Sequence, residues 1–343
     1  MAPDLNVGPA PRTTARETGG RTDRATRPPA ARVGALWHTA GPFAVFAVLL
    51  LVTGILNPGF LSGGLVILAI QATAILLVAL GQAAVLHVGS IDLSNAATAI
   101  LSAMILATAL GTTGPAAVVV CLVVATVVGV VNGVLVAYAQ VPSFALTLGT
   151  LGILQAASLV LSGSTTVYVT ANGELVSWLF VVTFAGLPAG FWVAALLAVL
   201  GWFVLQRTGL GQGLTAVGRN ETGALFSGLR ARRLKVVAFA ASGFLAGVAG
   251  IAIIAQAGAA SSFGLGSDLL LPGIAAAIVG GTAITGGHTN PINVIFGSLT
   301  IALIPITATA LGVTPQARSL VYGIVVVAAV ALTTRRVRGA SVF

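Results

Sequence analysis

The carboxylate of Asp92 is the first group in this sequence that raises a chemical question. Asp92 is the only formally charged residue between Arg32 and Glu174, and it lies in the run GSIDLS, residues 89–94. A charge at the centre of a bilayer costs about 2.5–3.5 kcal/mol on insertion scales, so such a group needs a polar or wet neighbourhood. The glycine and serines beside it can break one helix and cap the next, with Asp92 or Ser94 accepting backbone N–H bonds.

Three roles are open to Asp92. It can hold a broken or re-entrant helix end near a translocation path, because irregular backbone at membrane depth is tolerated where protein or a water-filled cavity surrounds it. It can instead contact substrate hydroxyls, or relay protons. We favour the first role. A simple count of spans places Asp92 at the cytoplasmic edge of the membrane, whereas a broken helix would place it deeper.

A second run of the same character, GGTAITGGHTN, occupies residues 280–290. Its four glycines and three threonines predict another interrupted helix end, a feature found at transporter binding sites. Asn132, between two glycines, is expected either to bond across a helix interface or to line the path. The residues expected at helix breaks or along a translocation path are Gly89, Ser90, Asp92, Ser94, Asn132, Gly280, Gly281, Thr282, Gly286 and Gly287.

The composition says what must surround these residues. Of 343 residues, 57% are hydrophobic and 7% are charged, and the mean hydropathy is +1.06. A soluble domain has about 25% charged residues, so most of this chain must lie in a bilayer. The net charge of +9 comes from basic clusters between long apolar runs, which indicates membrane topology rather than nucleic-acid binding. One cysteine excludes an internal disulfide, and three scattered histidines suggest no metal site.

The apolar runs predict an all-α polytopic integral membrane protein with about ten transmembrane helices, some of them interrupted. A helix needs about 20 apolar residues to cross a bilayer. Small residues in Gly129–Gly133 and Gly243–Gly247 follow the GxxxG pattern, which lets helices approach closely. The expected spans are 36–56, 65–88, 93–110, 115–138, 143–162, 188–206, 236–258, 269–286, 291–312 and 318–334.

The basic clusters predict the orientation of these spans. Lys and Arg gather in cytoplasmic loops, and an even number of spans separates each pair of neighbouring clusters. Both termini are therefore expected in the cytoplasm, with Arg318 as a tolerated exception on the outer side. The expected organisation is a disordered basic tail at 1–33, a transmembrane domain at 34–334 and a basic tail at 335–343. Within the domain, 207–235 is the cytoplasmic loop and 163–187 the external loop.

The cytoplasmic loop contains the signals of a short helix. Asn220 is a good N-cap, Glu221 in the first turn suits the helix dipole, and Gly228 can close the helix. Ala224 and Leu225 would present a small apolar face. An isolated helix of about two turns is marginal in water, so it needs something to pack against. It is either a connector lying against the bilayer or a knob that fits a groove on a cytoplasmic partner.

Four stretches in this chain resemble segments of the ribose-type ABC importer permeases, which carry monosaccharides. They are GSIDLS at 89–94, NGVLVAYAQVPSFALTLGT at 132–150, AVGRNETGALFSGLRARRLK at 216–235 and IVGGTAITGG at 278–287. They occur in the family's order, and the resemblance covers roughly residues 40–335. The chain departs from the family pattern at Ser90 and Ala283, and at Ser143, where the family has a second proline. In the third stretch, Gly223 replaces an alanine and Leu229 replaces an isoleucine.

The resemblance implies a permease subunit in a bacterial inner membrane that forms the path for a sugar or similar polar solute. Its implied partners are an ABC ATPase subunit, an extracytoplasmic substrate-binding protein, membrane lipid and a second permease copy, identical or homologous. ATP would be used by the partner, so this chain is expected to bind no cofactor and to be no enzyme; it also has no GxxxxGK[ST] loop. The residues implied in ATPase coupling are Gly218, Asn220, Glu221, Ala224, Ser227 and Gly228.

Two other functions compete with this expectation. An ion-coupled secondary transporter would use Asp92 as its coupling carboxylate, but proton and sodium routes usually need several polar partners. A membrane scaffold without transport would need no interrupted helices at depth. The glycine-rich runs argue against a scaffold.

Overall fold

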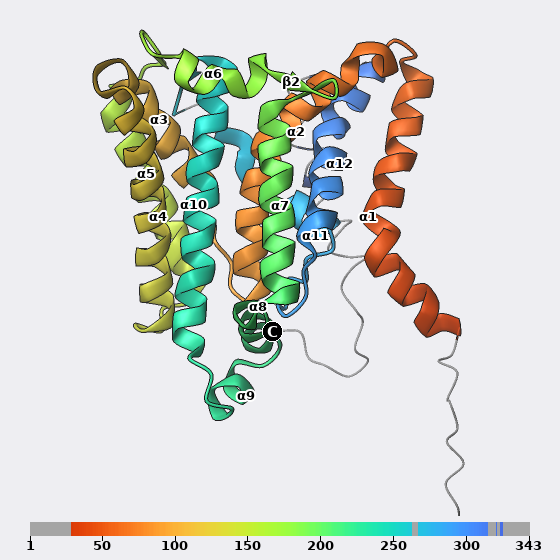
Figure 1. Cartoon of the computed structure of the whole chain (residues 1–343), viewed down its shortest axis with the longest axis vertical. Helices are drawn as coiled ribbons and strands as arrows, with labels where there is room; N and C mark the ends of the chain where they lie inside the picture. Colours follow the sequence, from red (N-terminus) through yellow and green to blue (C-terminus); the bar gives the residue numbers. More distant parts are fainter. Residues whose placement is uncertain (1–28, 263–266, 315–319, 321–322, 325–343) are drawn as a thin grey trace, which may run out of the picture.

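Long apolar helices run side by side through most of the described chain (Figure 1). The structure is a computed structural model, and it describes residues 29–262, 267–314, 320 and 323–324. Its helices are α1 (Pro29–Leu56), α2 (Phe60–His87), α3 (Asn95–Thr113), α4 (Pro115–Ala137), α5 (Ser143–Ser162), α6 (Glu174–Val181), α7 (Ala189–Arg207), α8 (Gly209–Arg219), α9 (Glu221–Phe226), α10 (Ala231–Ala257), η1 (Ser267–Leu269), α11 (Leu270–Val279) and α12 (Pro291–Ala310).

Seven helices of the described residues are long and apolar enough to cross a membrane, namely α2, α3, α4, α5, α7, α10 and α12. They correspond to seven of the ten expected spans, so the chain is a multi-pass membrane protein. The span at 36–56 lies within α1, which contains the apolar stretch Ala40–Leu56. The span at 318–334 falls almost wholly outside the described residues, as do most of the tail at 1–33 and all of the tail at 335–343.

The helix in the span expected at 269–286 ends earlier than the bounds of that span, at Val279. The helix there, α11, has ten residues, which is about 15 Å of rise and half of a bilayer core. Gly280 ends it as the C-cap, and the next glycine, Gly281, has a φ of +86°, a conformation that helices do not continue through. An interrupted helix at this point was expected, and the structure confirms it.

The longest helix of the second half, α10, packs against α2, α3 and α4. Its contact with α4 is a backbone-to-backbone approach, because a β-carbon on Gly129 would lie 3.1 Å from the Cα of Gly243 and would overlap the carbonyl oxygen of Phe239. The GxxxG pattern therefore does pack these two helices together.

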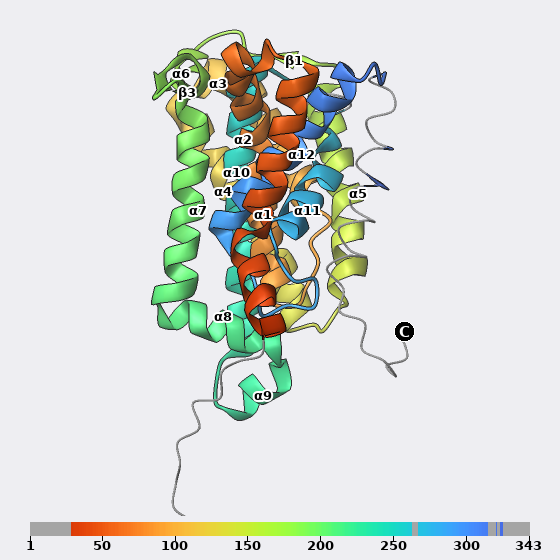
Figure 2. The same cartoon turned by 90° about the vertical axis from the view of Figure 1, so that its right-hand side faces the viewer.

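The segment expected as an external loop, 163–187, lies at one end of the helices. It contains α6 and the strands β1 (Val167–Tyr168), β2 (Thr183–Phe184) and β3 (Leu187–Pro188). β1 pairs antiparallel with β4 (Ala259–Ala260), and β2 pairs antiparallel with β3. These two-residue strands are the exception to the all-α expectation. Figures 1 and 2 show α6 at this end and α8 and α9 at the opposite end, which we call the α8–α9 end.

Candidate functional site

The run around Asp92 forms a helix break between α2 and α3, which we call the first break (residues 88–94). α2 ends at His87, Gly89 has a φ of +71°, and α3 begins at Asn95. The Asp92 side chain is 3% exposed. Its Oδ1 accepts hydrogen bonds from the Ser94 amide at 3.0 Å and the Ser94 hydroxyl at 2.6 Å. Asp92 therefore accepts the backbone N–H just before α3. The expected role of holding a broken helix end requires such a bond.

The second oxygen of Asp92 ties the first break to the other half of the chain. Oδ2 accepts a hydrogen bond of 2.9 Å from the hydroxyl of Ser242, which is buried on α10. Asn95 donates from Nδ2 to the same hydroxyl at 2.7 Å and to the Ser242 carbonyl at 3.0 Å. Both carboxylate oxygens are thus occupied by donors, and the carboxylate joins α3 to α10.

Asn132 bonds across a helix interface, which is one of the two roles expected for it. Its Nδ2 donates to the Ser94 hydroxyl at 2.9 Å, and its Oδ1 accepts from the Thr150 hydroxyl at 2.9 Å. Asn132 is 1% exposed. The chain of hydrogen bonds Thr150–Asn132–Ser94–Asp92 therefore runs from α5 through α4 to the first break.

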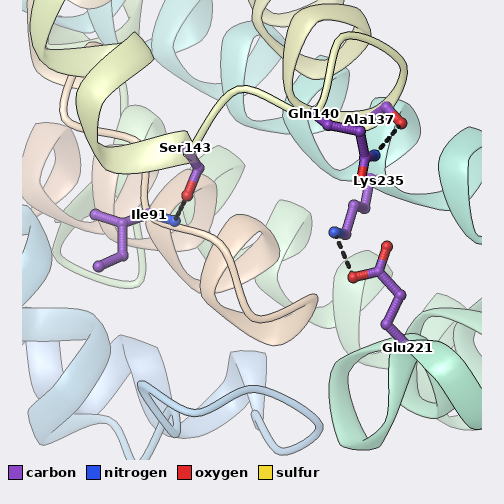
Figure 3. A network of polar contacts seen from close by, with 6 residues as sticks. All are labelled: Ile91, Ala137, Gln140, Ser143, Glu221 and Lys235. Carbon is purple, nitrogen blue, oxygen red and sulfur yellow. Dashed lines mark hydrogen bonds and ion pairs between the residues drawn. The ribbon is translucent and has the colours of Figure 1, made fainter. Parts of the chain in front are cut away.

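Side chains from other helices hold the open backbone of the first break. The Ile91 amide donates to the Ser143 hydroxyl at 3.1 Å, a contact drawn in Figure 3, and the Leu93 amide donates to the Thr147 hydroxyl at 3.0 Å. Gln82 donates from Nε2 to the Asp92 carbonyl at 2.6 Å. Irregular backbone at membrane depth needs such partners, because no bulk water is there to bond it.

Sequence reasoning missed several of these partners. Ser143 was noted only as a departure from the family's proline, yet its hydroxyl supplies the acceptor for the Ile91 amide. A signal for Gln82 existed, since an amide in the middle of an apolar helix has to find a partner. No comparable signal marks Ser242, whose partner Asp92 lies 150 positions away. The polar residues missed are Gln82, Thr147, Thr150, Thr215 and Ser242.

Residues 280–290, the second break, fold back on themselves. The Thr282 and Thr289 hydroxyls lie 2.7 Å apart, and the Ala283 amide donates to the His288 carbonyl at 2.9 Å. The amide of Gly287 donates to the carbonyl of His87, at the end of α2, at 2.8 Å. The second break is therefore bonded directly to the last residue of α2, which precedes the first break.

Gly218, in the last turn of α8, lies where the two breaks meet. A β-carbon on Gly218 would overlap the His87 carbonyl oxygen and would lie 2.5 Å from the Gly287 nitrogen. A β-carbon on Gly286 would lie 2.7 Å from the Gly218 oxygen and 2.9 Å from the Gly89 nitrogen. Only glycines allow these three backbones to touch. We call this meeting point the Gly218 contact.

A side-chain hydrogen bond supports the Gly218 contact. Thr215 on α8 donates its hydroxyl to the Gly211 carbonyl at 2.8 Å, so the 3.0 Å bond between His87 Nε2 and the Thr215 oxygen has the histidine as donor. His87 is 3% exposed, and it lies in the last turn of α2. α8 is thereby fixed to α2 at the residue whose carbonyl bonds the second break.

The short helix α9 extends beyond α8 (Figures 1 and 2) and has the caps that the sequence predicts. Asn220 Oδ1 accepts the Gly223 amide at 3.0 Å, and Ser227 donates its hydroxyl to the Gly223 carbonyl at 2.9 Å. Gly228 follows with a φ of +80°, which suits the residue after a C-cap. Glu221 pairs with Lys235 at 2.7 Å and so joins α9 to α10 (Figure 3).

The exposed apolar face of α9 differs from the expected one. Ala224 is 5% exposed and packs in a small core with Val217 of α8 and Ala231 of α10. Leu225 is 50% exposed and Phe226 is 89% exposed. Phe226 therefore takes the place expected of Ala224, because Ala224 faces inward to hold α9 against its neighbours.

The site combines interrupted helices with a buried polar network. In the part of the chain that the structure describes, no group of three or more His, Cys, Asp or Glu residues could hold a metal ion. What the site contains is two helix breaks, a buried polar network that fixes one of them, and a helix at the α8–α9 end in backbone contact with both. A displacement of α8 would reach both breaks at once.

Comparison with known proteins agrees with this architecture. Residues 64–330 match the family described as the branched-chain amino acid transport system / permease component. The chain is 31% identical over 302 residues to the D-allose transport system permease protein of Escherichia coli, covering 86% of this chain and 91% of that protein. It is 27% identical to the ribose import permease protein of Haemophilus influenzae, covering 84% of this chain and 90% of that protein.

A third relative is the fructose import permease protein of Rhizobium meliloti, with 30% identity covering 85% of this chain and 84% of that protein. No solved structure matches the chain. The family match and the similarity to these relatives each extend over most of the chain, including both breaks and α8. This chain therefore belongs to the family of branched-chain amino acid transport system permease components, on the branch whose relatives are ribose-type sugar import permeases.

Proposed function

We propose that this chain is the permease subunit of a binding-protein-dependent ABC importer in a bacterial inner membrane. It forms the path for a monosaccharide or a similar polar solute, and a separate ATPase supplies the energy. The observation that carries the proposal is the Gly218 contact, because it links a helix at one end of the molecule to both interrupted helices. The relatives named for D-allose, ribose and fructose support a monosaccharide as the solute.

The α8–α9 end is the proposed cytoplasmic face. It contains Arg207, Arg219, Arg230, Arg232, Arg233 and Lys235, and the positive-inside rule assigns such clusters to the cytoplasm. The exposed Leu225 and Phe226 form the apolar tip that an ATPase groove would receive. The opposite end, with residues 163–187, would then meet the extracytoplasmic binding protein, and a second permease copy would complete the path.

In this proposal the six residues implied in coupling have different tasks. Gly218 makes the contact with the breaks. Asn220, Ser227 and Gly228 shape α9, while Glu221 and Ala224 hold it against α10 and α8. Leu225 and Phe226, the exposed apolar residues of α9, make the direct contact with the ATPase.

The ion-coupled alternative is not favoured by the surroundings of Asp92. Its two oxygens accept three hydrogen bonds from Ser94 and Ser242, and it is 3% exposed. A coupling carboxylate has to gain and lose a proton or an ion in every cycle, which would break this network each time. A structural anchor requires only that the network stay intact.

The proposal is tested by co-purification of the tagged permease with its ATPase in mild detergent. The double variant Leu225→Ala, Phe226→Ala should lose the ATPase, whereas Phe203→Ala, on a 53% exposed site of α7, should keep it. Equal recovery of the ATPase with both variants would contradict the role of α9. Uptake that continues without ATP but stops when ion gradients collapse would contradict the importer itself.

A further inference from the structure

A cavity of about 220 Å³ lies between α7 and α10, and we call it the α7–α10 cavity. Figure 1 shows these two helices beside each other, with α2 behind them and α8 below. The cavity is lined by residues of all four helices and by Pro291 at the start of α12. It is separate from the polar network around Asp92, none of whose residues line it.

The cavity wall is hydrocarbon. Only two lining residues have polar side chains, His87 and Thr289. The Thr289 hydroxyl bonds Thr282, and His87 Nε2 bonds Thr215, so among these side chains only the buried Nδ1 of His87 lacks a hydrogen-bond partner within the described residues. The rest of the lining is Leu, Val, Ala, Gly and Pro. A sugar needs hydrogen-bond partners for several hydroxyl groups and one histidine nitrogen is too few, whereas an apolar cavity of about 150 Å³ is already enough to bind benzene.

The depth of the cavity matches one leaflet of a membrane. Its lining runs from Leu197 to Leu205 on α7 and from Val237 to Leu245 on α10, which is about 12 Å of helix rise on each. Half of a hydrocarbon core is about 15 Å. Val237 and Leu210 are each 40% exposed and mark an opening toward the α8–α9 end. The apolar molecules beside such an opening are the lipid acyl chains of that leaflet, which could enter the cavity.

An arginine lies just beyond the lining residues on each of the two helices, at the α8–α9 end of the cavity. Arg207 ends α7, two residues beyond Leu205, and Arg233 lies in the first turn of α10, four residues before Val237. Both arginines are exposed, and the ion pair found among the described residues uses Lys235 instead. Arginines at the head-group level attract anionic lipid through their charge.

We propose that the α7–α10 cavity binds one acyl chain of an anionic phospholipid from the leaflet at the α8–α9 end. The chain fills the space that Gly201 and Ala241 leave between the two spans, and the arginines contact its phosphate. The bound chain also packs against Leu214 of α8 and against His87. It therefore supports α8 one turn before the Gly218 contact. This inference requires that the chain span a membrane, not that the importer proposal hold.

The test is native mass spectrometry of the purified protein after incubation with phosphatidylglycerol, and separately with phosphatidylcholine of the same chains. A β-carbon on Gly201 meets only Pro291, at 3.6 and 3.7 Å, so Gly201→Leu fills the cavity without a backbone clash. Ala241→Phe fills it from α10. Leu196→Phe, on a 57% exposed site of α7 outside the lining, is the matched control.

The expected result is that wild type and Leu196→Phe retain phosphatidylglycerol, and that both filled variants retain about tenfold less, as expected when the apolar contact is lost. Equal retention by wild type and both filled variants would overturn the site. Equal binding of the two lipids would overturn the anionic head group. A wild-type protein that retains no phosphatidylglycerol and forms a dimer that both filled variants lose would show that a second copy covers the cavity, which also overturns the proposal. Unchanged melting temperatures of the variants in lipid-free detergent exclude a folding defect.

Discussion

Gly218 lies so close to His87 that a β-carbon on the glycine would overlap the carbonyl oxygen of the histidine. The same carbonyl accepts the amide of Gly287 at 2.8 Å. One peptide oxygen at the end of α2 thus receives the second break through a hydrogen bond and α8 through backbone contact. Because packed backbones cannot bend continuously, a shift of α8 has to move both breaks together or separate from them.

Replacing Gly218 by alanine should break this contact. The new methyl group meets backbone atoms of His87 and Gly287, which cannot rotate away as a side chain can. Overpacking of this kind costs about 1–3 kcal/mol, so we expect a lower free energy of unfolding and a loss of solute uptake by whole cells. Gly209→Ala, in the first turn of the same helix with nothing within 4 Å of its added carbon, is the control and should leave both unchanged. Normal uptake in Gly218→Ala would show that the contact does not transmit movement.

The structural role of Asp92 is tested by two substitutions. Asp92→Asn keeps one acceptor oxygen for Ser94 but places an NH2 group against the Ser242 hydroxyl, which costs about 1–3 kcal/mol if a buried partner stays unsatisfied. Asp92→Ala removes all three bonds and should cost more. We expect uptake to fall in step with the melting temperature across wild type, Asp92→Asn and Asp92→Ala. A stable Asp92→Asn protein without uptake would instead show that the charge itself takes part in transport.

The bond between Asn132 and Thr150 should appear in a double-mutant cycle. Hydrogen bonds between helices in a membrane average about 0.6 kcal/mol, with a maximum near 1.7. The variants Asn132→Leu and Thr150→Val, alone and together, should show a coupling energy in this range when unfolding is followed in mixed micelles. Thr126→Val is the control, because its hydroxyl bonds its own helix at Leu122. The changes in the free energy of unfolding caused by Thr126→Val and by Thr150→Val should add, with no coupling energy between them.

The cap of α9 should determine how often this helix opens. Asn220→Ala removes the acceptor for the Gly223 amide, and loss of an N-cap costs about 1 kcal/mol. Hydrogen exchange at the Gly223 amide should therefore accelerate about fivefold. Asn220→Asp keeps an acceptor oxygen and should exchange as wild type does. Equal exchange in Asn220→Ala and wild type would mean that the ion pair of Glu221 and Lys235 is enough to hold α9.

Much of the architecture was predictable from local patterns. The apolar runs gave seven spans that the structure confirms, and Asn220, Glu221 and Gly228 gave α9, because capping depends on neighbours within one turn. The GxxxG spacings predicted close helix contact without naming the partner. The span at 269–286 was misjudged because its composition stays apolar past Val279, whereas the positive φ of Gly281, Gly286 and Gly287 ends any helix.

The sequence by itself determined that this chain lies in a membrane and at which residues its helices are interrupted. It also determined that Asp92 needs polar neighbours. These conclusions follow from hydropathy and from the backbone preferences of neighbouring residues. Only the tertiary structure decided which residues are the hydrogen-bond partners. Ser242 lies 150 positions from Asp92, and Thr215 lies 128 positions from His87. The packing of α10 against α2, α3 and α4, and of α8 against α2, brings these partners together. Hydrogen bonds and glycine contacts act over a few ångströms of space, so no pattern along the chain could specify that both breaks meet at Gly218.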